Sequence, residues 1–160
     1  MATARAAVGV AVLDGKLYAV GGQDFVLGRL SSVERYDSAT NAWEAVAPMA
    51  EARYKLAVAV LDGRLYAVGG QDDDYNTLSS VERYDPAANA WEAVAPMAAV
   101  RCHLAVAVLD GKLYAVGGQD AGYNTLSSVE RYDPDTNAWE AVVPIATARR
   151  ASIAVLMQWA

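Results

Sequence analysis

The sequence predicts an all-β protein built from repeated four-stranded sheets, and three observations support this prediction. A segment of the form AVLDG(K/R)LYAVGGQD occurs at residues 11–24, 59–72 and 107–120. Equivalent positions such as Leu13, Leu61 and Leu109 lie 48 residues apart, and a fixed period of about 20–50 residues is typical of repeat architectures. Apolar residues within the repeat alternate in the manner of strands, and no helical period occurs.

The first half of each repeat predicts a β-hairpin. In the second copy, residues 56–60 alternate leucine and valine with alanine, a pattern that suits an inner strand. Asp62-Gly63 then predicts a type I′ turn, since glycine adopts positive φ angles without steric cost. The returning strand, residues 65–68, ends at Gly69-Gly70, where missing side chains allow a neighbouring backbone to approach.

The second half of each repeat predicts two further strands. A polar loop at residues 71–77 leads into the alternating segment 80–84, a turn at 85–89 and a fourth strand at 91–94. A sheet of four short antiparallel strands has two partly apolar faces and cannot bury both alone, so successive sheets must stack. Stacked four-stranded units are the blades of a β-propeller.

The repeats resemble the kelch family. The resemblance is carried by a double glycine, a tyrosine, a tryptophan seven residues later and the phrase VERYD(P/S). These are Gly21-Gly22, Tyr36 and Trp43 in copy one, Gly69-Gly70, Tyr84 and Trp91 in copy two, and Gly117-Gly118, Tyr132 and Trp139 in copy three. The resemblance implies a kelch propeller whose tryptophans lie on the outermost strands. We expect the three tryptophans to be equivalent and to pack between blades.

The chain is therefore expected to form half a propeller over residues 1–160. Blade one covers residues 5–52, blade two 53–100 and blade three 101–148, followed by an inner-strand-like tail at 149–160. Closed propellers have about four to eight blades, so two copies of three blades predict a C2 homodimer closed as a six-bladed ring. Either the tail or the N-terminal strand closes each junction. We expect the N-terminal strand to keep its place, because the Asp14-Gly15 turn ties it to its neighbour.

Composition narrows the possible partners. The chain has 160 residues, 54% of them hydrophobic, with a net charge of −6, which disfavours nucleic acid and anionic membranes. We find no membrane span and no signal peptide, and a single cysteine fits a reducing compartment. We expect a cytoplasmic location if the protein is natural. The uniformity of the copies, however, is typical of a designed or symmetrised recombinant sequence.

Two functions follow from these features. The first is a designed, self-assembling kelch scaffold without catalytic activity, and the alternative is a kelch-type module that binds a peptide or protein through its loop face. The resemblance implies that binding uses the loops between second and third strands and those that enter the inner strands. The corresponding candidates are Arg53, Tyr54, Lys55 and Arg101, to which the apolar loop residues Phe25, Val26 and Leu27 are added because exposed apolar groups often mark contact surfaces. Phe25–Leu27 could equally fold back over the blade edge.

Catalytic and metal-binding residues are scarce. Cys102 and His103 are the only thiol and imidazole, and as neighbours on a strand they are expected to point to opposite faces rather than form a dyad. They are a weak metal-site candidate only if several chains bring them together. The acidic loop Asp72-Asp73-Asp74 lacks the spacing of a calcium loop. We therefore predict no enzyme activity, no metal and no cofactor.

Overall fold

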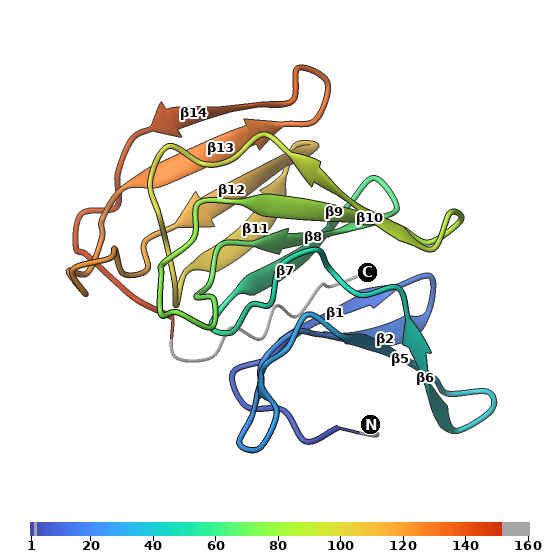
Figure 1. The fold of residues 1–160 in the computed structure, drawn as a ribbon. Helices are drawn as coiled ribbons and strands as arrows, with labels where there is room; N and C mark the ends of the chain where they lie inside the picture. The colour runs from blue at the N-terminus through green and yellow to red at the C-terminus, as the bar shows by residue number, and fades with distance from the viewer. Residues whose placement is uncertain (2, 152–160) are drawn as a thin grey trace.

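The computed structural model, which describes residue 1 and residues 3–151, consists of three four-stranded antiparallel sheets that fan out side by side (Figure 1). The all-β prediction and its three blades of four strands are thus confirmed for a single chain. Blade one contains β1 (Gly9–Leu13), β2 (Lys16–Val20), β5 (Val33–Asp37) and β6 (Ala42–Val46). Blade two contains β7 (Ala57–Leu61), β8 (Arg64–Val68), β9 (Val81–Asp85) and β10 (Ala90–Val94). Blade three contains β11 (Ala105–Leu109), β12 (Lys112–Val116), β13 (Val129–Asp133) and β14 (Ala138–Val142).

The strands of each blade are ordered as they occur in the chain, from the inner strand to the outer one. In blade two, Ala57 pairs with Val68 and Leu61 with Arg64, so the hairpin turn falls on Asp62 and Gly63. Their φ angles are 49° and 69°, and two positive φ angles are what a type I′ turn requires. The inner strands β1, β7 and β11 lie next to one another, which places them nearest the axis of the fan (Figure 1).

The double glycines are points where consecutive blades approach closely. Gly69 has φ +61°, and a Cβ atom there would lie 2.3 Å from the carbonyl oxygen of Arg101. The next amide, that of Gly70, donates a hydrogen bond of 2.9 Å to the same oxygen. Any side chain at Gly69 would therefore push blade three away from blade two, as the sequence predicted.

Two apolar layers hold the three blades together. Between blades one and two, Tyr18, Val20 and Val33 pack against Leu65 and Tyr84. The same arrangement recurs between blades two and three. A tilted tyrosine pair lies in each layer, with ring centroids 5.9 Å apart for Tyr18 and Tyr84 and 5.8 Å apart for Tyr66 and Tyr132.

Within the described residues, no further blade covers the two ends of the fan. Val58 is 9% exposed inside the stack, whereas the equivalent Val10 on blade one is 52% exposed. Likewise Leu61 is 3% exposed and its equivalent Leu109 on blade three is 57% exposed. The same side chains are thus core residues in the middle of the chain and surface residues at its ends.

Some local features differ from the sequence-based expectation. The loop of copy one forms an extra two-stranded hairpin, β3 (Gln23–Asp24) and β4 (Gly28–Arg29), where only a loop was expected. Residues 152–160 of the expected tail lie outside the described residues. Residue 1 and residues 3–151 contain no helix long and apolar enough to cross a membrane.

Candidate functional site

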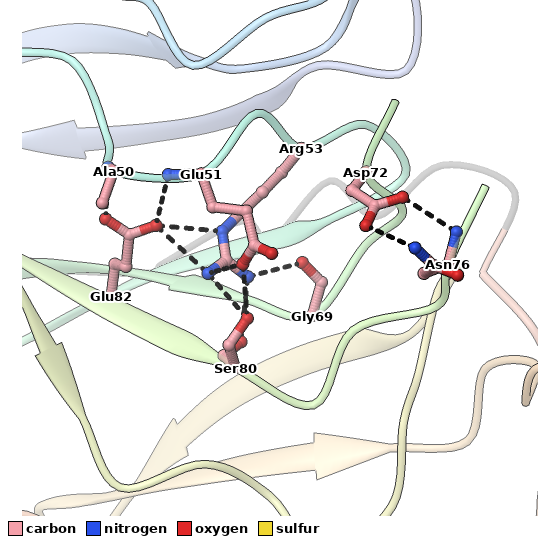
Figure 2. Close-up of polar contacts among 8 residues, drawn as sticks. All are labelled: Ala50, Glu51, Arg53, Gly69, Asp72, Asn76, Ser80 and Glu82. Atoms are coloured by element: carbon pink, nitrogen blue, oxygen red, sulfur yellow. Dashed lines mark hydrogen bonds and ion pairs between the residues drawn. The ribbon is translucent and has the colours of Figure 1, made fainter. Parts of the chain in front are cut away.

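The two arginines predicted to receive a partner are buried instead. Arg53 is 1% exposed and Arg101 is 0% exposed. In Figure 2, the Arg53 guanidinium lies among groups of its own repeat, and its Nη1 atom donates to the carbonyl oxygens of Gly69 (3.0 Å) and Ser80 (2.9 Å). Its Nη2 atom lies 3.1 Å from a carboxylate oxygen of Glu82. Neither guanidinium is therefore a free surface donor, and the expectation that Arg53 and Arg101 contact a partner through the loop face is corrected.

The glutamate of each VERYD phrase explains this burial. Glu82 is itself buried and accepts hydrogen bonds from the amides of Ala50 (2.7 Å) and Glu51 (3.2 Å) as well as from Arg53 (Figure 2). Arg101 repeats the arrangement with Glu130 at 3.0 Å. A buried charge is costly unless it is paired and hydrogen-bonded. Each pair thus fixes the segment that joins two blades.

Tyr54 and Lys55 are half-buried and contact each other. The Lys55 ammonium lies 4.5 Å from the centre of the Tyr54 ring and donates to Oε1 of Gln71 at 3.1 Å. The Arg29 guanidinium lies on this ring as well, 4.7 Å from its centre. These residues form a small cationic and aromatic cluster at the start of blade two.

Phe25, Val26 and Leu27 are exposed apolar residues of the loop face. They are 91%, 90% and 69% exposed, so the alternative that they fold back over the blade edge is wrong. Asp24 shapes the loop by accepting the amides of Val26 (2.7 Å) and Leu27 (2.8 Å). The hydrogen bonds from Leu27 and Val26 hold the pKa of Asp24 below its usual value.

Arg29 is a residue whose role was not predicted. It is buried, its amide donates to Oδ1 of Asp73 (3.0 Å) and its Nη1 atom donates to the Asp73 carbonyl oxygen (3.0 Å). Its guanidinium also lies 3.9 Å from the centre of the Tyr75 ring. Arg29 therefore ties the first loop to the second. The available signal was that copy one has arginine where copies two and three have Thr77 and Thr125.

In the acidic loop, the Asp72 carboxylate accepts hydrogen bonds from groups of the same loop. As Figure 2 shows, Asp72 Oδ1 accepts the amide of Asn76 (2.9 Å) and Oδ2 accepts the Asn76 side-chain amide (2.9 Å). Asp72 Oδ1 also accepts the amide of Asp74 (3.0 Å). Asp120 and Asn124 form the same turn in blade three. The aspartate is accordingly part of the loop's own hydrogen bonding.

Cys102 and His103 were expected to lie on a strand, and the structure places them before it. Cys102 forms an isolated bridge with Gln119, and His103 has φ +51°, while β11 begins only at Ala105. Cys102 is fully buried, and burial raises the pKa of its thiol. Burial, followed by the charges of Lys55 and Arg150, lowers the pKa of His103. Residue 1 and residues 3–151 contain no cluster of three or more potential metal ligands.

Polar contacts at the outer strands join consecutive blades. The indole Nε1 of Trp91 donates to the carbonyl oxygen of Ala47 at 2.9 Å, and the amide of Ala47 donates to Oδ1 of Asn89 at 3.0 Å. Blade three repeats both contacts, at 2.9 Å each, with Trp139, Asn137 and Ala95. One tryptophan and one asparagine thus hold the preceding blade by its backbone.

These joining groups are open at the two ends of the stack. Among the described residues, no preceding blade packs against Trp43 and Asn41 of blade one, and Val143 of blade three, the equivalent of Ala47 and Ala95, is exposed. Within the described part of one chain, Trp43 therefore lacks the contact with a preceding blade that Trp91 and Trp139 make. A hollow of about 280 Å³ marks the open side of blade one. It is lined by Thr3, Arg5, Glu34, Trp43, Val46 and Pro48, among others.

Comparisons with known proteins agree with this architecture. The Kelch motif matches at residues 4–50, 52–98 and 101–144. Kelch-like protein 35 from Homo sapiens is 57% identical over 42 residues, which are 26% of this chain and 7% of that protein. Its counterpart from Mus musculus is 59% identical over 39 residues, which are 24% of this chain and 7% of that protein. The solved structure of YjhT superposes with a TM-score of 0.79 at 18% identity, covering 91% of this chain and 54% of its own.

Proposed function

Because this chain belongs to the kelch-repeat family, whose repeats generally mediate protein binding, we propose that it is a self-associating scaffold whose partner is a second copy of itself. Blade three of each copy packs on blade one of the other. Two equivalent junctions then relate the copies by a two-fold axis along the central channel. The result is a six-bladed ring.

The observation that carries this proposal is the complementarity of the two open ends. Inside the chain, a tryptophan and an asparagine of one blade hold a backbone group of the blade before it. Blade one offers Trp43 and Asn41 for this contact, and blade three offers the amide and carbonyl of Val143. The partner subunit's Trp43 and Asn41 therefore meet Val143 as Trp91 and Asn89 meet Ala47.

The apolar surfaces of the two ends match in the same way. Tyr36 on blade one and Tyr114 on blade three are the half-buried equivalents of the residues that form the tyrosine pairs inside the stack. Val10 and Leu109 are exposed where their equivalents are core residues. Exposed apolar side chains of this kind at both ends are consistent with an interaction surface.

The expected number of blades supports a pair of chains. Propellers have about four to eight blades, and of the multiples of three only six lies in this range. The superposition with YjhT, which leaves nearly half of that chain unmatched, supports a complete fold larger than this one. The near identity of the three copies supports a designed or symmetrised scaffold. We assign it no reaction.

The solution mass of the 160-residue chain tests the proposal directly. We expect light scattering at micromolar concentration to give twice the chain mass of 17.0 kDa. Leu109→Asp and Val10→Asp each place a charge in both junctions and should give single chains. Val26→Asp, which adds the same charge on the loop face, should stay a dimer. A wild-type chain that is monomeric or trimeric at micromolar concentration would refute the six-bladed ring.

A second candidate function is binding of a peptide or protein through the loop face. The exposure of Phe25, Val26 and Leu27 favours it. Selection of binders from a peptide library, followed by Phe25→Ser and Val26→Ser, tests this candidate, because these exposed residues can be changed without unfolding blade one. Loss of binding at unchanged melting temperature supports it, and binding that is insensitive to both substitutions contradicts it. Arg53 and Arg101 are unsuitable for this test, since their substitution removes a buried ion pair.

A further inference from the structure

The segment that joins blades occurs four times in this chain. Residues 2–5 and 146–149 have the same sequence, Ala-Thr-Ala-Arg, and residues 50–53 and 98–101 are the corresponding joints between the blades. Their last residues, Arg5, Arg53, Arg101 and Arg149, are each 48 residues apart. Two internal joints therefore use one segment each, and the two outer segments are copies of each other.

An internal segment serves the blade before it and the blade after it at once. The backbone of Arg53 bonds to blade one, because its amide donates to Leu30 O (3.1 Å) and its carbonyl accepts from the Gly22 amide (2.8 Å). Its guanidinium bonds to blade two, chiefly at Glu82. One arginine thus makes both halves of the joint, which are the backbone contacts to the preceding blade and the side-chain contacts to the following blade.

At the ends of the stack, these two halves are divided between different arginines. Arg149 makes the backbone half on blade three, with its amide 3.1 Å from Leu126 O and its carbonyl 2.8 Å from the Gly118 amide, while its side chain is exposed. Arg5 makes the side-chain half in blade one. Its guanidinium donates to Gly21 O (2.8 Å), Ser32 O (2.8 Å) and Glu34 Oε1 (2.9 Å).

The Arg5 guanidinium fills what we call the Glu34 site, formed by Glu34, Gly21 O and Ser32. The Arg5 side chain is 1% exposed there, and the Thr3 amide lies 3.3 Å from the same carboxylate. In a head-to-tail pair of chains, this is the position that Arg149 of the partner subunit would take. The same partners, Glu34, Gly21 O and Ser32, would thus serve two segments of identical sequence.

We propose that residues 3–5 cap the Glu34 site and thereby compete with residues 146–149 of the partner subunit for the junction. This inference rests on the proposed self-association. Ring closure then exchanges Arg5 for Arg149 of the partner subunit, so Glu34 keeps a guanidinium throughout and no buried charge is left unpaired. The N-terminal segment lowers the affinity of the two chains, because closing must displace it.

Residues 146–149, the segment that would enter the junction, need no rearrangement on blade three of their own chain. The Ile145 amide already donates to Ser127 O (3.0 Å) and the Ala151 amide to His103 O (2.7 Å). The latter contact continues the backbone ladder in which Lys55 N donates to Ala7 O and His103 N to Lys55 O. In blade one, only residues 3–5 have to leave, while Ala6 and Ala7 keep their backbone contacts and β1 keeps its pairing with β2. In this arrangement the N-terminal strand stays in place while residues 3–5 are displaced, which is the alternative we expect from the sequence.

Identical substitutions in the two identical segments test the competition. We expect Arg149→Ala to raise the dissociation constant of the dimer roughly tenfold or more, because a charge-assisted hydrogen-bond set is lost from the junction. We expect Arg5→Ala to lower the dissociation constant roughly fivefold, because the cap is weakened. Sedimentation velocity over a dilution series measures both. Deletion of residues 1–5 should tighten association as Arg5→Ala does, and Arg149→Lys should recover part of the affinity.

Other combinations of dissociation constants contradict the competition between the two segments or the self-association itself. If Arg5→Ala weakens the dimer and Arg149→Ala does not, the N-terminal segment fills the junction and the inference is overturned. Equal effects of the two substitutions also overturn it, since competition requires opposite signs. If wild-type and all variants remain single chains, the proposed self-association itself fails. Melting monitored by circular dichroism shows whether a variant has lost blade one, and the deletion variant then decides the sign.

Discussion

Replacing Trp91 by alanine tests how much of the stability of a blade comes from the blade before it. Trp91 contacts the Tyr84 ring, with centroids 5.2 Å apart, and donates its indole proton to Ala47 O at 2.9 Å. Truncating a packed tryptophan costs about 3–5 kcal/mol, and we expect about 3 kcal/mol because Trp91 is only partly buried. About 1 kcal/mol of this belongs to the hydrogen bond with the preceding blade.

Trp43→Ala is the matched control. Trp43 makes the same contact within its own blade, with the Tyr36 ring 5.3 Å away, but in the described part of the chain no neighbouring blade packs against it. At concentrations where light scattering shows single chains, we expect Trp43→Ala to lower the free energy of unfolding by only about 1 kcal/mol, mainly the aromatic pair. The difference of about 2 kcal/mol between the variants measures the contact between blades.

Urea unfolding followed by far-ultraviolet circular dichroism gives both free energies. Equal losses for the two variants in single chains would refute the reasoning, because the preceding blade would then contribute nothing at the tryptophan. Repeating the unfolding at higher protein concentration gives a further check. Once dimers form, the loss caused by Trp43→Ala should rise toward that of Trp91→Ala, since the partner subunit's Val143 then accepts the indole proton of Trp43.

Three further predictions follow from the same contacts. Gly69→Ala should lower the free energy of unfolding in urea by well over the roughly 1 kcal/mol expected for Gly63→Ala. Both glycines have positive φ, at which a Cβ costs about 1–2 kcal/mol. Only at Gly69 would the Cβ also meet a backbone oxygen, 2.3 Å away. Equal losses would show that blade three can shift. The Cys102 thiol should react with a thiol reagent far more slowly in the folded than in the urea-unfolded chain, because it is buried and its pKa is raised, and a similar rate in both states would contradict its burial. Removing residues 150–160 should leave the self-association intact, because Arg149 and β1 are retained, and single chains of the truncated protein in sedimentation would show that the tail itself closes the ring.

The candidate site was only partly predictable. The exposure of Phe25 and its neighbours was one of two alternatives. The hairpin of this loop was not predicted, and in the structure Asp24 stabilises it by accepting two local amides. Arg29 was missed altogether. Its role depends on Asp73 and Tyr75, which lie more than forty residues away in the sequence, and no local pattern contains that information.

The sequence by itself determined the strands, the turns and the period, because these depend on alternation, on Asp-Gly pairs and on residues at fixed local spacing. It also determined that Gly69-Gly70 accepts a close backbone. Only the tertiary structure decided which equivalent residues are core and which are surface: Val10 and Val58, or Trp43 and Trp91, occupy the same place in their repeats and differ solely in whether a blade precedes them. It also decided that Arg53 and Arg101 are structural, since the carboxylates of Glu82 and Glu130 reach them only when the segment between blades folds over the next sheet. A repeat specifies its own shape, whereas burial and charge pairing depend on its neighbours.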